Sequence, residues 1–490
     1  MTDTTAPADS AAGVATAPAR RWWLLAGLGL AQIMVTLDAT IMNIALPSAQ
    51  ADLGFSAASR SWVLTAYTVA FAGLLLLSGR LADRIGRRNV LVIGLIGFML
   101  ASAVGGAAPT FAVLIVARAV QGVFAALLAP AALATVTTTF PSGPDRARAF
   151  GIFGAIGVAG ASVGLILGGV LTEYLSWRWA MYINILFAIP AILFAVLLAP
   201  RGRTGVARID LPSTLTVSAG LVGIVYGFTN AGEHHWGDFW TVAPLIAGAV
   251  LLALFVLLQS RVAHPLLPLR VLRDRDRVGG LVGIFVGTAS LFGVVLFSAY
   301  YLQGVLGWSA LKTGVAFLPQ PVALITAGVV LGPRLNRRFG SKAVMPAGLL
   351  LATLAVLWLT RLDSNSNYAA DMLPAIIVLG FGLGLFFPIS TALSTRGLLP
   401  EDAGVGSALV GTFQQVGGSI GVAVLNAIAA SATAGYLTSH VSDHRSTATL
   451  SAAAAVHGYT TAYWTSAAIF AVAALSTALL LRREAAVPAS

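Results

Sequence analysis

Asp38 and Arg118 are charged residues that the sequence places deep inside long apolar runs. A charge at the centre of a membrane helix costs about 2.5–3.5 kcal/mol on insertion scales, so such residues are usually paired or functional. Burial disfavours the charged form of a carboxylate, whereas a nearby guanidinium favours it. A movement of Arg118 relative to Asp38 would therefore change the affinity of the carboxylate for a proton. The alternative is a salt bridge that only joins two helices.

Composition indicates what kind of element holds these charges. Of the 490 residues, 58% are hydrophobic and only 10% charged, against roughly 25% charged in a soluble domain. Stretches long enough to cross about 30 Å of hydrocarbon recur along the chain, which predicts an all-α polytopic membrane protein. The expected fourteen spans are residues 22–47, 60–79, 89–108, 111–139, 147–172, 179–199, 211–230, 239–259, 279–303, 312–332, 343–360, 371–395, 403–432 and 459–481.

The distribution of basic residues accounts for the net charge of +11. Most of the 29 lysines and arginines fall in alternate loops, as expected when positive charge is retained on the cytoplasmic side. We therefore predict both termini in the cytoplasm of a multi-pass protein of the inner (cytoplasmic) membrane. The bilayer is an expected partner and nucleic acid is not. The first apolar run resembles a signal peptide, but it is too long for one and carries Asp38.

Other kinds of site leave no signal in the sequence. The absence of cysteine excludes disulfides and thiolate metal sites. His440 and His444 are four residues apart, but they fall in a long loop where solvated histidines are expected. No catalytic constellation, phosphate loop or intramembrane metal cluster is visible. We predict no catalytic residue, no metal and no cofactor.

A basic loop at Gly79–Arg88 is repeated later in the chain. Leu335–Lys342 aligns with Leu81–Arg88, with Arg337 in the place of Asp83. Parallel repeats related by an axis along the membrane normal are a transporter architecture. Two six-helix bundles with two additional central helices account for fourteen spans. The expected divisions are a cytoplasmic tail (1–20), an N-terminal bundle (21–200), two linker helices (201–260), a cytoplasmic loop (261–278), a C-terminal bundle (279–483) and a second tail (484–490).

These motifs resemble the major facilitator superfamily, specifically its fourteen-helix drug:proton antiporters. Leu37–Pro47 is similar to the first-helix signature, Arg118–Gly122 to the fourth-helix signature and Trp177–Asn184 to the start of the sixth helix. In that family helices 1 and 4 line the central cavity, and counting about 1.5 Å per residue puts Asp38 and Arg118 at nearly the same depth. The resemblance implies the major facilitator fold and a contact between the two residues, which would couple proton movement to transport.

The resemblance also implies two further elements. The loop between the second and third spans is similar to the cytoplasmic gate of the family, which would consist of Gly79, Asp83, Arg84, Gly86, Arg87 and Arg88. The fifth span carries an antiporter-type stripe of small residues that permits close helix packing. This stripe consists of Gly160, Gly164, Gly168 and Gly169, with Leu165 at a position where the family pattern has proline.

Polar side chains in the apolar spans either bind substrate or bond to a neighbouring helix. The candidates for a substrate cavity are Gln32, Asn43, Tyr67, Gln121, Asn184, Gln303, Gln320 and Gln414. Pro319–Pro321 and Gly384–Pro388 are expected to interrupt their helices, because freed backbone is tolerated where protein or a cavity covers it.

The favoured function is a secondary active transporter that exports drugs, antibiotics or other amphipathic molecules in exchange for protons. Its partners would be protons and a lipophilic substrate that is neutral or cationic. A facilitator or proton symporter of a polar metabolite is the alternative, and the direction of flux under a pH gradient separates the two. A membrane enzyme or sensor on the same scaffold would need a catalytic cluster or a soluble domain, and neither is visible.

Overall fold

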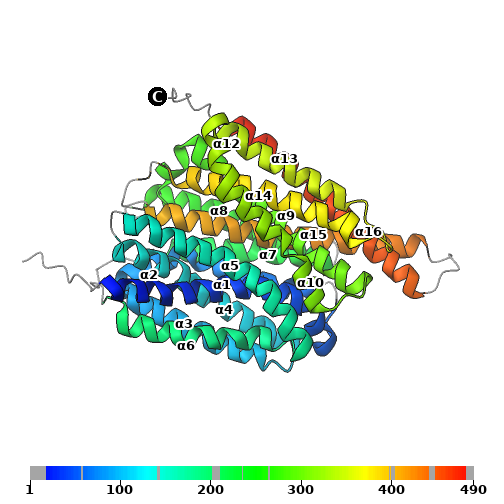
Figure 1. Cartoon of the computed structure of the whole chain (residues 1–490), viewed down its shortest axis with the longest axis horizontal. Helices are drawn as coiled ribbons and strands as arrows, with labels where there is room; N and C mark the ends of the chain where they lie inside the picture. The colour runs from blue at the N-terminus through cyan, green and yellow to red at the C-terminus, as the bar shows by residue number, and fades with distance from the viewer. Residues whose placement is uncertain are drawn as a thin grey trace, which may run out of the picture.

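The computed structural model describes residues 18–56, 59–140, 144–200, 210–233, 236–262, 265–396, 398, 403–440 and 447–481. All regular secondary structure in these ranges is helical, and the helices run side by side along the long axis of the molecule (Figure 1). The predicted tail 484–490 and His444 lie outside the described residues, as does most of the predicted tail 1–20.

The first eight helices follow the expected spans closely. They are α1 (Pro18–Leu53), α2 (Arg60–Ile85), α3 (Arg87–Gly106), α4 (Phe111–Thr139), α5 (Pro144–Tyr174), α6 (Trp179–Leu198), α7 (Leu211–Glu233) and α8 (Phe239–Arg261). The remaining long helices are α9 (Arg275–Tyr300), α13 (Ser341–Leu359), α14 (Leu373–Thr395), α15 (Ala403–Ser439) and α16 (Thr447–Leu480).

One expected span is a chain of shorter pieces. Between α9 and α13 the helix is divided into α10 (Ala310–Ala316), α11 (Pro319–Ile325), the π-helix η3 (Thr326–Leu331) and α12 (Gly332–Phe339). The break at Phe317 and Leu318 precedes Pro319, so the predicted interruption at Pro319–Pro321 is confirmed. Of the further π-helical turns, η2 (Tyr301–Val305) continues α9 and η4 (Tyr368–Met372) precedes α14.

The prediction that Gly384–Pro388 interrupts its helix was wrong. The helix α14 is continuous through these residues. A proline removes one backbone hydrogen bond, and neighbouring helices can compensate for it in a membrane protein. Here Gly380 and Gly384 allow the backbones of α11 and η3 to approach α14 closely.

The described residues contain eleven helices that are long and apolar enough to cross a membrane. Three other expected spans contribute only shorter apolar helices within these residues, namely Trp62–Leu75, Val163–Tyr174 and Pro212–Phe228. The all-helical membrane architecture is therefore confirmed, whereas the count of fourteen spans is not.

The helices form two groups. The helices α1 to α6 pack mainly on one another, as do α9 to α16, and Figure 1 shows the first group below the second. The helices α7 and α8 pair with each other, and α7 lies against both α2 and α15. We call the end of the molecule where α1 begins and α2 ends the near end, and the end where α1 and α5 terminate the far end.

The glycine stripe of α5 seats this helix on α1. A Cβ at Gly164 would collide with Thr40 Oγ1 and would lie only 2.9 Å from the carbonyl oxygen of Leu37. Gly160 and Gly168 meet the backbone of α1 in the same way, whereas Gly169 faces α10 of the other group. The helix is continuous through Leu165, so the residue that replaces the expected proline does not interrupt it. The stripe therefore brings α5 into backbone contact with α1.

We predict that Gly164→Ala destabilises the protein, because the added methyl group meets backbone that cannot rotate away. Overpacking of this kind costs about 1–3 kcal/mol. Thermal unfolding of the purified protein in detergent should show a lower Tm. The matched control is Gly435→Ala in α15, where a Cβ meets nothing within 4 Å. An equal Tm for the two variants would show that α5 and α1 are not closely packed at Gly164.

Candidate functional site

The carboxylate of Asp38 is the centre of a buried polar cluster. Asp38 has no exposed surface. Its Oδ2 accepts a hydrogen bond of 2.6 Å from Nη1 of Arg118. Its Oδ1 accepts bonds from Nδ2 of Asn184 at 2.8 Å and from Nε2 of Gln121 at 3.3 Å. The charge of the carboxylate is thus met by one guanidinium and two amides.

Arg118 connects this cluster to the neighbouring helices. Its Nη1 also donates to Oε1 of Gln121 at 2.9 Å, and its Nε donates to the carbonyl oxygen of Val63 at 3.1 Å. The guanidinium lies over the ring of Tyr67, 4.5 Å from the centroid, in a cation–π contact. Gln121 in turn donates to Oγ of Ser102 at 2.6 Å. The cluster joins side chains or backbone from α1, α2, α3, α4 and α6.

Helix geometry explains why these groups converge. Arg118 and Gln121 are three residues apart and so share one face of α4. Residues 38 and 40 differ by about 200° around a helix axis. As a result α1 presents Asp38 to α4 and α6 while it presents Thr40 to the glycines of α5.

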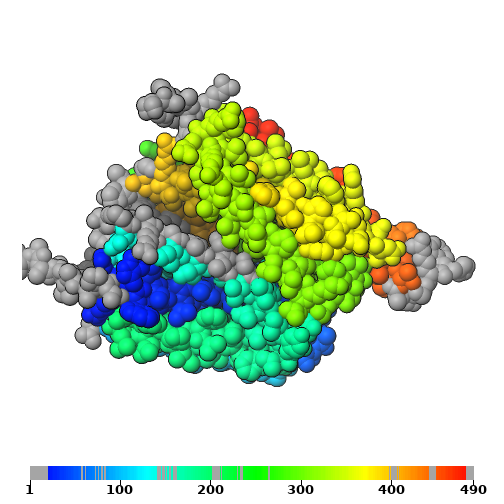
Figure 2. Space-filling view, viewed as in Figure 1, coloured from blue at the N-terminus to red at the C-terminus, as the bar shows by residue number. Residues whose placement is uncertain are grey.

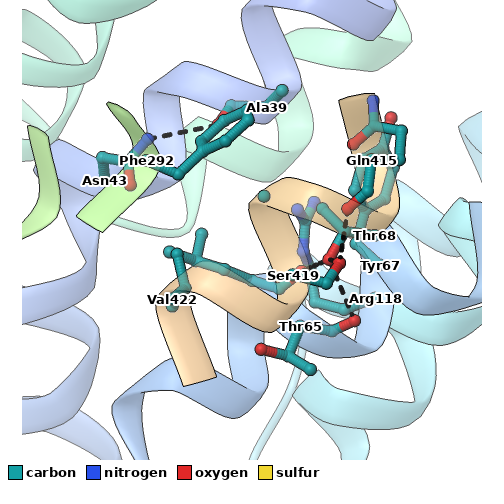
Figure 3. A pocket seen from close by; sticks show the side chains of 12 residues that line it. Ala39, Asn43, Thr65, Tyr67, Thr68, Arg118, Phe292, Gln415, Ser419 and Val422 are labelled. Atoms are coloured by element: carbon teal, nitrogen blue, oxygen red, sulfur yellow. Dashed lines mark hydrogen bonds between the residues drawn. The ribbon is translucent and has the colours of Figure 1, made fainter. Parts of the chain in front are cut away.

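A cavity lies beside the cluster, between the two groups of helices. Its empty volume is about 400 Å³, part of it open to solvent. Figure 3 shows side chains from α1, α2, α4 and α15 facing this space, with Phe292 from α9 at its edge. Arg118 and Tyr67 belong to its wall, whereas Asp38 does not. The lining residues are Ala39, Asn43, Leu64, Thr65, Tyr67, Thr68, Arg118, Phe292, Gln415, Gly418, Ser419 and Val422.

Two of the predicted cavity residues, Asn43 and Tyr67, line this space. Gln121 and Asn184 instead bond to the Asp38 carboxylate behind the wall. Gln414 is exposed and does not line the cavity, whereas its neighbour Gln415 does.

The other predicted cavity residues contact neighbouring helices. Nε2 of Gln303 donates to the carbonyl oxygen of Ile44 at 3.3 Å. Gln320 is buried where α11 packs on α14, and Gln32 lies against Gly157 of α5. None of these three side chains is among the residues that line the cavity.

Several lining residues were missed by the sequence analysis. Thr65 and Thr68 are three residues apart on α2, and Gln415 and Ser419 are four apart on α15. Such spacings place polar groups on one helix face and were a usable signal. Nothing in the local sequence marks Phe292, because phenylalanine is common in lipid-facing and buried positions alike. A hydrogen bond between Ser419 and Thr68 joins the two groups of helices beside the cavity.

The repeated basic loops have equivalent backbone conformations. Gly86 and Gly340 separate consecutive helices in the two copies, with positive φ angles of 89° and 76° that favour glycine. In the first copy Arg88 donates from Nη2 to the carbonyl oxygen of Val196 at the end of α6, at 2.6 Å. Arg84 is exposed and Arg87 is half-buried. Gly79 and Asp83 belong to α2, and the side chain of Asp83 is not among the described ones.

The two groups of helices meet closely at the far end. Gly314 of α10 lies against the backbone of Leu165, and the backbone N–H of Leu311 donates to Oε2 of Glu173 at 3.0 Å. Arg60 of α2 lies over the ring of Tyr300 in α9, 4.5 Å from the centroid. Figure 2 shows α5 and α10 in contact on the right, which is the far end. The cavity is therefore covered on this side.

Comparison with known proteins gives close sequence relatives. A family model described as Major Facilitator Superfamily matches residues 28–422. Puromycin resistance protein pur8 of Streptomyces alboniger is 46% identical over 459 residues, which cover 93% of this chain and 90% of the relative. Cephamycin export protein CmcT of Amycolatopsis lactamdurans is 39% identical, covering 84% of this chain and 86% of its own. Multidrug transporter protein MdtP of Bacillus subtilis is 32% identical, covering 84% and 75%.

Solved structures share the fold at much lower identity. A POT family peptide transporter in an autoinhibited state has a TM-score of 0.67 at 18% identity, covering 96% of this chain and 98% of its own. A bacterial homologue of the human lysosomal transporter Spinster, in an inward-facing and unoccupied conformation, has a TM-score of 0.65 at 16% identity, covering 95% and 98%. These similarities show the fold alone.

We predict that Arg118→Leu strongly destabilises the protein, because it leaves the Asp38 carboxylate buried without its counter-charge. Removal of one partner of a buried ion pair costs about 3–5 kcal/mol. Adding Asp38→Asn to this variant should restore much of the lost Tm, since the uncompensated charge is then gone. If the second substitution instead lowers the Tm further, the two residues do not act as a pair.

Proposed function

The chain belongs to the major facilitator superfamily, and we propose that it exports drug-like or antibiotic-like small molecules across the cytoplasmic membrane in exchange for protons. Two relatives that are named for a compound, pur8 and CmcT, match over more than four fifths of this chain. The family model and these relatives identify a transporter rather than an enzyme.

The observation that carries the coupling proposal is the buried pair of Asp38 and Arg118. The described residues contain two other ion pairs, and in both the partners are partly exposed. Of these three pairs, only the pair of Asp38 and Arg118 is removed from water. Its protonation would remove the negative charge that holds Nη1 of Arg118, at 2.6 Å in this state.

Release of Arg118 would change the cavity wall directly, because this residue is part of that wall. The same guanidinium holds the carbonyl of Val63 in α2 and lies over Tyr67. A change in its position therefore acts on α2, which bonds to α15 across the cavity through Thr68 and Ser419. This is a physical route from proton binding to the contact between the two groups of helices.

We assign the near end to the cytoplasm and place both termini there. The excess of basic residues at this end supports the assignment. The closed contacts at the far end then correspond to a state that faces the cytoplasm. The same proposal includes fourteen spans, six-helix bundles at 21–200 and 279–483, linker helices within 201–260 and a cytoplasmic gate at the first basic loop. The separate packing of α7 with α8 supports the division.

We predict that Asp38→Asn abolishes uphill export while the protein remains in the membrane, since asparagine keeps an acceptor for Arg118 but cannot exchange a proton. Proteoliposomes with an imposed pH gradient and a panel of neutral antibiotics and lipophilic cations provide the measurement. Asp145→Asn is the matched control, because Asp145 is in a partly exposed pair with Arg21. Unchanged pH-dependent export by Asp38→Asn would sink the coupling proposal.

The natural absence of cysteine allows a direct test of orientation. We predict that a membrane-impermeant maleimide labels Ser364→Cys, in the exposed loop before η4 at the far end, in intact cells. Asn89→Cys, which is exposed at the start of α3 at the near end, should react only after permeabilisation. The reverse pattern would mean that the proposed orientation is inverted.

A further inference from the structure

We propose that the cavity selects aromatic molecules that are rich in hydrogen-bond acceptors and carry no fixed positive charge. This inference rests on the proposed export function and specifies its substrate class. It follows from the polar groups that line the cavity and from where the counter-charge of Arg118 lies.

The cavity wall carries hydrogen-bond donors without acceptors. The hydroxyls of Tyr67 and Thr65 are buried and have no hydrogen-bond partner among the described residues. Both residues line the cavity and are 1% exposed. A buried polar group without a partner costs free energy that a bound ligand can recover. Each hydroxyl can donate to a carbonyl, ether or hydroxyl oxygen of a ligand.

Arg118 adds to this set of donors. Its Nε and Nη1 bond to Val63, Gln121 and Asp38. We find no acceptor for its Nη2 within the described part of the chain. A guanidinium has five N–H donors and no acceptor, so Nη2 can donate to an oxygen or nitrogen acceptor of a bound ligand.

None of the described residues that line the cavity is acidic. Arg118 is the one charged residue among those that line it. The compensating carboxylate of Asp38 lies behind Arg118, where it is occupied by bonds from Arg118, Asn184 and Gln121. A cationic ligand would approach a guanidinium before it reached a carboxylate, and the repulsion would increase when Asp38 is protonated. Charges interact strongly at low dielectric, so a fixed cation is disfavoured.

The opposite wall suits an aromatic ring. Phe292 of α9 and Val422 of α15 face the donors of α2 and α4 across the space (Figure 3). Aromatic pairs that stack with an offset or meet edge to face gain free energy beyond the burial of area. The ligand would place its ring system on the Phe292 side and its oxygens toward Tyr67, Thr65 and Arg118.

Equilibrium binding to the full-length protein in nanodiscs, without any gradient, tests this selectivity. The probes are flavone, which carries a carbonyl and a ring oxygen, 2-phenylnaphthalene, which has a similar ring system without oxygen, and the fixed cation tetraphenylphosphonium. Binding to empty nanodiscs is subtracted. We expect flavone to bind about tenfold more tightly than either of the other probes.

Variants identify the groups responsible. Tyr67→Phe keeps the ring below Arg118 and removes only the hydroxyl, so we expect about three- to tenfold weaker binding of flavone and unchanged binding of 2-phenylnaphthalene. Thr65→Val should have a similar effect and provides a second test if the first variant is unstable. Tyr226→Phe is the matched control, because Tyr226 packs on Trp62 and does not line the cavity.

Three results would overturn the inference: no saturable binding of flavone, binding of tetraphenylphosphonium as tight as that of flavone, or equal affinity for flavone in the wild type, Tyr67→Phe and Thr65→Val. The transport assay decides the proposed function separately. Gradient-driven export of tetraphenylphosphonium together with its tight binding would leave the export function in place and exclude only this substrate class.

Discussion

The relative arrangement of the N-terminal helices depends on the burial of two opposite charges away from water. The carboxylate of Asp38 and the guanidinium of Arg118 are buried, and the desolvation of such a pair can exceed its Coulomb energy unless further hydrogen bonds satisfy it. Here Gln121, Asn184 and the Val63 carbonyl supply those bonds. Because they come from different helices, α1, α2, α4 and α6 must hold one relative arrangement for the pair to remain favourable. The glycines of α5 let a further helix pack closely behind Asp38.

Neutral contacts are frequent in the second group of helices. The ion pairs whose two partners are both described, such as Asp38 with Arg118, involve α1, α4, α5 or the residue before α6. In the other group, neutral bonds such as Ser298 to Tyr463 join α9 and α16, and close glycine contacts join α14 to α11 and η3. The π-helical turns η2, η3 and η4 also belong to this group. The sequence repeat thus preserves the glycine turns at Gly86 and Gly340 while the interiors of the two halves differ.

Residues from both groups of helices line the cavity. Its wall on the N-terminal side consists of α1, α2 and α4 residues, whose positions are fixed by the charged cluster, and its other wall consists of apolar and neutral polar residues from α9 and α15. Arg118 belongs both to the cluster and to the wall. This double position gives a physical link between the charge state of Asp38 and the surface that a ligand meets.

The sequence by itself determined the class of protein, the positions of most helices, the repeat and the importance of Asp38 and Arg118. These features depend on local patterns: hydrophobic length, the placement of basic loops and the rarity of charge in apolar runs. The partners of the pair were harder to predict, because Gln121 and Asn184 have the same sequence signal as a residue that faces a cavity. Only tertiary structure decided that they lie behind the wall, that Gln415 rather than Gln414 faces the space, and that Phe292 takes part. Successive residues of a helix point in directions about 100° apart. Which of them faces a cavity therefore depends on how helices far apart in the sequence pack together.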